Sequence, residues 1–182
     1  LPICGKSTLL KILFGSLRAK HSYIRINGER TGKAYLTGKV GYLPQDSFLP
    51  THEKVSSLIG LMVEDPVLRT LLSEDVRIQA IRDKRVYQLS GGELRYLEIC
   101  LLMYQPTDFL LLDEPFTGLE PIYVQYITEL ILRFKDKKGF VISDHHYRHV
   151  LDVATEISLL QHGSCRRIHH PKELEFFYLP DG

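Results

Sequence analysis

Two short apolar runs constrain the possible folds of this chain more than any other feature. Residues 109–112 (FLLL) and 140–143 (FVIS) are typical of strands that are buried on both faces of a parallel sheet. Helical patterns stand before and between them, and the alternation of strands and helices indicates an α/β architecture. We therefore predict a parallel sheet with a ligand site at the edge where its strands end.

The first of these runs ends in two adjacent acids, Asp113 and Glu114. Carboxylates at the end of a buried strand are costly unless a cation meets them, and magnesium is such a cation. Because successive side chains of a strand point in opposite directions, one acid can hold the metal while the other faces an attacking water. The alternative is a pair of acids that only leads the strand into a loop.

A second feature is the segment Leu89-Ser90-Gly91-Gly92-Glu93, which precedes a helical pattern over residues 91–103. Glycines at the start of a helix leave its backbone amides unblocked, and such amides bind anions. The alternative is a helix that merely begins at Ser-Gly-Gly. Within the helix we expect the leucines to pack and Arg95 to face the solvent.

The chain opens with the last half of a phosphate-binding loop, G-x-x-x-x-G-K-[ST], formed by Gly5, Lys6, Ser7 and Thr8. In such a loop the amides cradle phosphate, the lysine reaches the outer phosphates and the serine hydroxyl binds magnesium. The first glycine of the motif would stand before Leu1, so we interpret the chain as truncated within this motif. The β-branched Ile3 fits the positive φ angles of such loops poorly.

The remaining elements complete the predicted order of the chain. Residues 23–28 predict a strand and hairpin, and residues 39–45 a short strand that places Gln45 at the same sheet edge, although a plain polar loop residue would also fit. Helical patterns then replace strands until about residue 90. A helix over residues 121–134, a hairpin over 156–168 and a closing helix over 171–177 follow.

Composition narrows the classes of function. Lysine and arginine total 23 against 22 acids, a net charge of +1, so we expect no nucleic-acid partner. The three cysteines lack zinc-binding spacing and favour a reducing, cytoplasmic setting. Asp144 and His145 stand at the end of the second apolar run, where a structural role for the histidine is the alternative to a functional one. His145, His146 and His149 could place two metal ligands one helical turn apart, but no cysteine accompanies them.

Taken together, these motifs resemble the nucleotide-binding domain of ABC-type ATPases over nearly the whole chain. Lys6 and Ser7 resemble the end of Walker A, Gln45 the Q-loop and residues 89–93 the family signature, while Asp113 and Glu114 resemble Walker B and His145 the switch histidine. Residues 116–121 resemble the D-loop, with Glu120 where the family usually has aspartate. The resemblance implies a P-loop NTPase (RecA-like) core, residues 1–46 and 91–182, with an inserted α-helical subdomain at about residues 47–90.

The same resemblance implies how the site would work. Two subunits would sandwich two ATP molecules, each bound by one phosphate loop and by Ser90, Gly91 and Gly92 of the other subunit. Magnesium would lie on Ser7, Asp113 and Gln45, Glu114 would polarise the water, and Lys6 and His145 would stabilise the γ-phosphate.

We expect an ATP-hydrolysing subunit of an ABC transporter, at the cytoplasmic face of a membrane. Its partners would be a transmembrane permease and a second copy or a paired second ABC subunit. Two alternatives stay open at this point. One is a soluble ABC ATPase serving DNA repair, translation or cluster assembly, and the other is a nucleotide-binding regulatory module without turnover.

Overall fold

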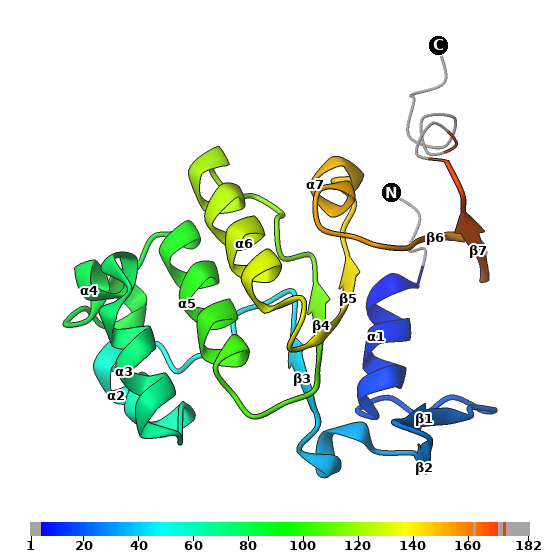
Figure 1. Cartoon of the computed structure of the whole chain (residues 1–182), viewed down its shortest axis with the longest axis horizontal. Helices are drawn as coiled ribbons and strands as arrows, with labels where there is room; N and C mark the ends of the chain where they lie inside the picture. Colours follow the sequence, from blue (N-terminus) through cyan, green and yellow to red (C-terminus); the bar gives the residue numbers. More distant parts are fainter. Residues whose placement is uncertain (1–4, 162, 171–172, 174–182) are drawn as a thin grey trace.

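A three-stranded parallel sheet stands at the centre of the computed structural model, which describes residues 5–161, 163–170 and 173 (Figure 1). Its strands lie in the order β3 (Val40–Leu43), β4 (Phe109–Asp113) and β5 (Gly139–Ser143). Val40 pairs with Phe109, and Phe109 with Gly139, so all three strands end at one edge. Both apolar runs are confirmed as sheet strands, but the prediction that the second is buried on both faces was wrong, because Val141 of β5 is 41% exposed. Within the described residues, β5 pairs with β4 on one side and with no strand on the other.

Helices cover both faces of this sheet (Figure 1). Helix α1 (Lys6–Phe14) packs on one face, and α5 (Gly91–Met103) and α6 (Pro121–Phe134) pack on the other. The central strand, β4, contributes side chains to the hydrophobic cores on both faces of the sheet. Leu110 and Leu112 belong to the core beneath α5 and α6, and Leu111 belongs to the core beneath α1. This alternation is the two-sided burial that the apolar run predicts.

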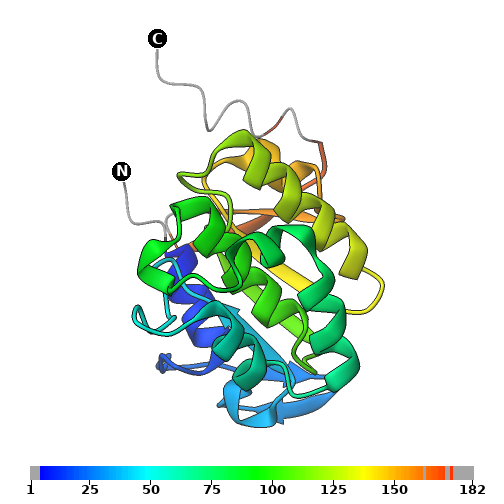
Figure 2. The same ribbon diagram turned by 90° about the vertical axis from the view of Figure 1, so that its left-hand side faces the viewer.

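Between β3 and α5 the chain forms three short helices, α2 (Val55–Met62), α3 (Pro66–Glu74) and α4 (Val76–Ile81), and a single 3₁₀ turn, η2 (Val86–Gln88). Aspartates begin two of them: Asp65 accepts hydrogen bonds from the first-turn amides of α3, and Asp75 does so for α4. The predicted helical segment is therefore present. It lies beside α5, on the side away from the sheet (Figures 1 and 2).

Two antiparallel hairpins confirm the strand predictions outside the sheet. Strands β1 (Ile24–Ile26) and β2 (Glu29–Thr31) join through Asn27 and Gly28, whose φ angles of 51° and 87° are those of a tight Asn-Gly turn. A 3₁₀ turn, η1 (Ala34–Thr37), leads into β3. After the short helix α7 (Tyr147–Leu151), strands β6 (Ile157–Gln161) and β7 (Ser164–Ile168) form the second hairpin.

Several predictions fall on residues outside the described ranges. Ile3 and the missing start of the phosphate loop are among them, and so is the closing helix, apart from Glu173. Within the described ranges, no helix is both long and apolar enough to cross a bilayer.

The prediction for Arg95 was wrong. Arg95 is buried, as is every residue of α5 from Arg95 to Met103. Helix α5 is enclosed by β3, α6 and the helical segment, so it has no solvent-facing side after its first turn. A helix enclosed in this way must bury its polar residues along with its leucines.

Candidate nucleotide-binding site

The predicted site residues from four elements come together where the sheet strands end. Gln45 follows β3, Asp113 ends β4 with Glu114 directly after it, and His145 follows β5. Parallel pairing in register brings these strand ends to one edge. Residues at the start of α1 lie at the same edge, because Lys6 and Ser7 form hydrogen bonds with Asp144 and Asp113.

The start of α1 is fixed by a glycine. Gly5 stands before the helix at φ 84°, a left-handed conformation that favours glycine. From the first turn, Lys6 Nζ donates to the backbone oxygen of Asp144 at 3.3 Å, and Ser7 Oγ donates to Asp113 Oδ1 at 3.0 Å. Lys6 and Ser7 are thus joined to β4 and to the end of β5, while Thr8 occupies the same first turn.

Asp113 is buried, with 1% of its surface exposed, and hydroxyl groups surround its carboxylate. Oδ1 accepts from Ser7 and from Ser143 Oγ at 3.3 Å, and Oδ2 accepts from the Tyr42 hydroxyl at 3.1 Å. Burial, together with the charge of Asp113, raises the pKa of Tyr42, so this phenol stays a donor. Sequence analysis missed Tyr42; its signal was a phenol within an apolar strand, since a buried tyrosine hydroxyl needs a partner.

The oxygens at Asp113 fit magnesium. Ser7 Oγ and Asp113 Oδ1 are hard ligands already 3.0 Å apart, and magnesium is held by one or two such protein groups together with water and phosphate. Among the described residues, no three His, Cys, Asp or Glu side chains form a metal-binding group. His145, His146 and His149, for which the sequence left a metal site as an alternative, form no such group either.

Glu114 adopts an unusual backbone conformation. Its φ is 51°, which is uncommon for a residue with a side chain, and its amide donates to the backbone oxygen of Ser143 at 2.6 Å. Its carboxylate lies between two predicted site residues: Gln45 Nε2 donates to Oε2 at 3.1 Å, and His145 Nδ1 lies 3.6 Å from Oε1. A carboxylate held in this way is placed to accept a proton from water.

Asp144 holds the loops that follow β4 and β5. Its buried carboxylate accepts from the Phe116 amide at 3.0 Å and from the His146 amide at 2.8 Å. The neighbouring His145 Nδ1 lies 3.4 Å from Thr117 Oγ1. The sequence placed Asp144 at the sheet edge but indicated no role for it, because its partners are backbone amides of loops.

The Ser-Gly-Gly segment begins α5 as predicted. Ser90 is exposed at the N-cap, where its hydroxyl accepts from the Glu93 amide and the Glu93 carboxylate accepts from the Ser90 amide. Burial alone would raise the pKa of Glu93, but hydrogen bonds from Lys84 and the Ser90 amide lower it overall. The amides of Gly91 and Gly92 stand in the first turn, where a helix offers them no carbonyl partner. The segment lies apart from the start of α1 (Figure 1).

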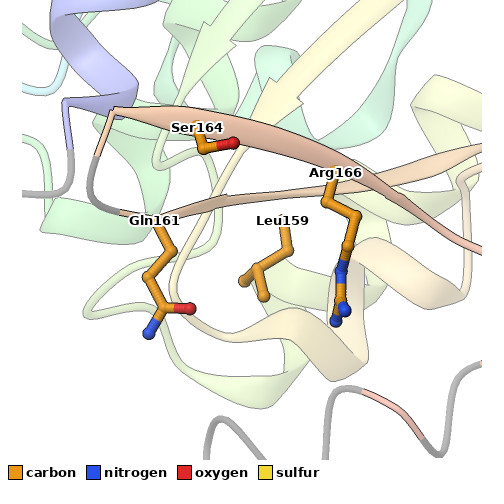
Figure 3. Close-up of a pocket in the computed structure, with 4 residues that line it drawn as sticks. All are labelled: Leu159, Gln161, Ser164 and Arg166. Carbon is orange, nitrogen blue, oxygen red and sulfur yellow. The ribbon is translucent and has the colours of Figure 1, made fainter.

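A shallow hollow on the second hairpin is separate from this site. Figure 3 shows Leu159, Gln161, Ser164 and Arg166 around it, all from β6 and β7. It contains none of the predicted site residues.

Comparisons with known proteins agree with this geometry. The family described as ABC transporter matches residues 4–117. The chain is 30% identical to the lipopolysaccharide export system ATP-binding protein LptB of Haemophilus influenzae, over 93% of this chain and 76% of that protein. It is 31% identical to a putative ABC transporter ATP-binding protein of Pyrococcus furiosus, over 96% of this chain and 72% of the relative.

Solved structures share the fold. One is a nucleotide-free ATP-binding cassette from an ABC transporter, with a TM-score of 0.79 and 20% identity, covering 98% of this chain and 86% of that one. Another is the ATP-binding subunit of an ABC transporter, with a TM-score of 0.80 and 19% identity, covering 98% and 79%. At these identities the likeness concerns the fold, and it agrees with the predicted α/β P-loop architecture.

Proposed function

The chain belongs to the ABC transporter family of ATP-binding proteins, and from that premise we propose which of its residues perform each part of ATP hydrolysis. Members of this family bind ATP with magnesium and hydrolyse it to drive transport. The observation that carries our assignment is the meeting of Ser7, Gln45, Asp113, Glu114 and His145 at one sheet edge through direct contacts.

We assign the phosphate-binding role to Gly5, Lys6, Ser7 and Thr8. Their place at the start of α1 gives the phosphates free first-turn amides and the charge of Lys6. Ser7, Asp113 and Gln45 would hold magnesium, which supplies positive charge beside the phosphates when bound.

Glu114 is the proposed base. Its carboxylate lies within contact distance of both Gln45 and His145, which places it between the metal ligands and the histidine assigned to the γ-phosphate. The strained backbone at this residue supports a functional role, because such strain concentrates at active sites.

Ser90, Gly91 and Gly92 are assigned to the ATP of a second subunit. ABC ATP-binding subunits work as dimers with membrane components. In this chain Ser90 and Gly91 are exposed and Gly92 is partly covered, and the segment lies apart from the phosphate-binding end of α1 (Figure 1). The amides of one subunit would then complete the site of its partner, which is a second copy or a paired ABC subunit.

We further propose that the helical subdomain, about residues 47–90, contacts a transmembrane permease and so places the chain at the cytoplasmic face of a membrane. Val67 and Leu71 lie one turn apart on α3 and are exposed, as is Leu61 at the end of α2. Leu71→Asp should reduce copurification of the permease. Leu36→Asp, at another exposed leucine outside the subdomain, should leave it unchanged; equal recovery with both variants would refute this contact.

The experiment that tests the catalytic assignment is Glu114→Gln in the full-length protein. The amide keeps the size of the side chain but cannot accept the proton, so turnover should fall by about 10²- to 10⁴-fold. ATP binding should persist, and an ATP-bound dimer should accumulate on size-exclusion chromatography. Glu129→Gln changes an exposed acid on α6 and serves as the matched control. Equal turnover in Glu114→Gln and the parent would remove Glu114 from this role.

A further inference from the structure

A buried ion pair in α5 touches the backbone on both sides of the proposed base. Arg95 and Glu98 have side chains that are 10% and 2% exposed, and Arg95 Nη1 lies 3.2 Å from Glu98 Oε2. Burying two charges costs more than their mutual attraction returns unless further hydrogen bonds satisfy them. The partners of this pair therefore indicate what it does.

The guanidinium of Arg95 binds the ends of two strands at once. Nη1 donates to the backbone oxygen of Pro44, just after β3, at 2.8 Å. Nη2 donates to the backbone oxygens of Asp113 at 2.8 Å and of Glu114 at 3.1 Å. One planar group thus joins the residue before Gln45 to the two acids at the end of β4.

Glu98 holds the other side of the Gln45 loop. Its Oε1 accepts from the Phe48 amide at 3.2 Å, while its Oε2 accepts from Arg95. The pair consequently fixes the chain immediately before and shortly after Gln45, leaving only residues 45–47 between the two attachments. The side chain of Gln45 then donates to Glu114.

We propose that Arg95 is a positioning residue for ATP hydrolysis, which holds the backbone of Glu114 and the Gln45 loop in the arrangement that aligns their side chains. This inference rests on the role proposed for Glu114. Arg95 does not touch the reacting groups; it acts through the carbonyl oxygens of Asp113 and Glu114. Glu98 keeps the guanidinium in place and neutralises its charge.

The geometry requires arginine rather than any cation. Its fork offers several donors in one plane, which can reach carbonyls of two strands together. A lysine ammonium at the same position is a single point with a flexible stem, and it cannot hold both strand ends. Because Glu114 occupies a costly positive-φ conformation, loss of the bond to its carbonyl oxygen should let this residue relax.

The test compares Arg95→Lys and Arg95→Gln with the parent in the full-length protein. Measured quantities are kcat for ATP, the dissociation constant for a nonhydrolysable ATP analogue, and the melting temperature. Since misplacement of a catalytic group by about 1 Å costs on the order of 100-fold, kcat should fall at least about tenfold, with the analogue affinity unchanged. In the Glu114→Gln background, Arg95→Lys should lower the residual rate no further.

Arg69→Lys is the matched control. Arg69 also donates to two backbone oxygens, those of Val63 at 2.9 Å and Glu64 at 3.2 Å, but it lies in the helical segment. Its substitution should leave kcat unchanged.

The outcomes separate the two proposals. Unchanged kcat in both Arg95 variants, while Glu114→Gln loses turnover, would overturn the positioning role alone. A parallel loss of kcat, analogue affinity and thermal stability would show Arg95 to be purely structural and would overturn it as well. Retained turnover in Glu114→Gln would instead overturn the assignment on which the inference rests.

Discussion

The two glycines that begin α5 should respond to alanine in opposite ways. A Cβ added at Gly92 would lie 2.2 Å from Tyr123 Cδ2 and 2.6 Å from its Cγ, whereas one added at Gly91 would meet nothing within 4 Å. Because Cγ is close to the backbone of α6, a rotation of the ring cannot clear the clash. The ring must retreat by about 1 Å or more, which separates α5 from α6 and disturbs the edge contact of Tyr123 with Tyr126.

The magnitudes follow from these contacts. Overpacking of this kind costs about 1–3 kcal/mol. For a chain of this size each kcal/mol shifts the melting temperature by about 2–4 °C, so Gly92→Ala should melt about 2–12 °C below the parent. Gly91→Ala has room for its methyl group and should gain about 0.4–1 kcal/mol, because alanine restricts the unfolded chain.

Urea and thermal unfolding without nucleotide measure these effects apart from any role in ATP binding. The double variant Gly92→Ala, Tyr123→Ala should lose less stability than the sum of the two single losses, since alanine at position 123 has no atom at the clashing Cγ, Cδ2 and Cε2 positions. Equal melting temperatures for Gly91→Ala and Gly92→Ala would refute the reasoning. So would a double variant whose loss is the sum of the two single losses.

Three further predictions concern single hydrogen-bonded groups. Tyr42→Phe removes a hydrogen-bond donor to the buried carboxylate of Asp113. The free energy of unfolding, measured in urea without nucleotide, should therefore fall by about 1.5–3 kcal/mol. An unchanged value would mean that the Tyr42 hydroxyl does not stabilise the folded chain. The pKa of Glu93 is lowered in the folded chain. The stabilisation that its carboxylate contributes is therefore present above the ordinary carboxyl pKa and is lost as pH falls through the pKa of the folded chain. In urea unfolding between pH 7 and 3, the free energy of unfolding should fall more steeply in the parent than in Glu93→Gln. Asp65→Ala removes two hydrogen bonds at the start of α3 and should cost about 0.5–2 kcal/mol, whereas Asp65→Asn should recover most of that stability in the same assay.

The regular elements were predictable because their signals are local. The apolar run of β4 is buried on both faces, and the helix over residues 121–134 begins at Pro121 as its sequence indicates. The meeting of Gln45, Asp113 and His145 could also be predicted, since parallel strands end at one edge. What those side chains do there remains a proposal.

Arg95 and Tyr42 could not be placed from the sequence, because their roles depend on what encloses them. Helical periodicity gives the direction of a side chain but not whether a neighbour covers it, and α5 is covered on every side. The available signal was the charged pair Arg95 and Glu98, three residues apart and the only charged residues of α5 after its first turn. The partners of Arg95 are backbone oxygens, which every residue carries, so no residue type identifies them in advance.

The outer side of β5 offers a place at which the parallel sheet can be extended. Within residues 5–161, 163–170 and 173, no strand is hydrogen-bonded along that side, so alternate amide and carbonyl groups of β5 face outward there. A further strand that paired with these groups would widen the sheet beside the ends of β4 and β5, and the exposed Val141 would then gain an apolar neighbour.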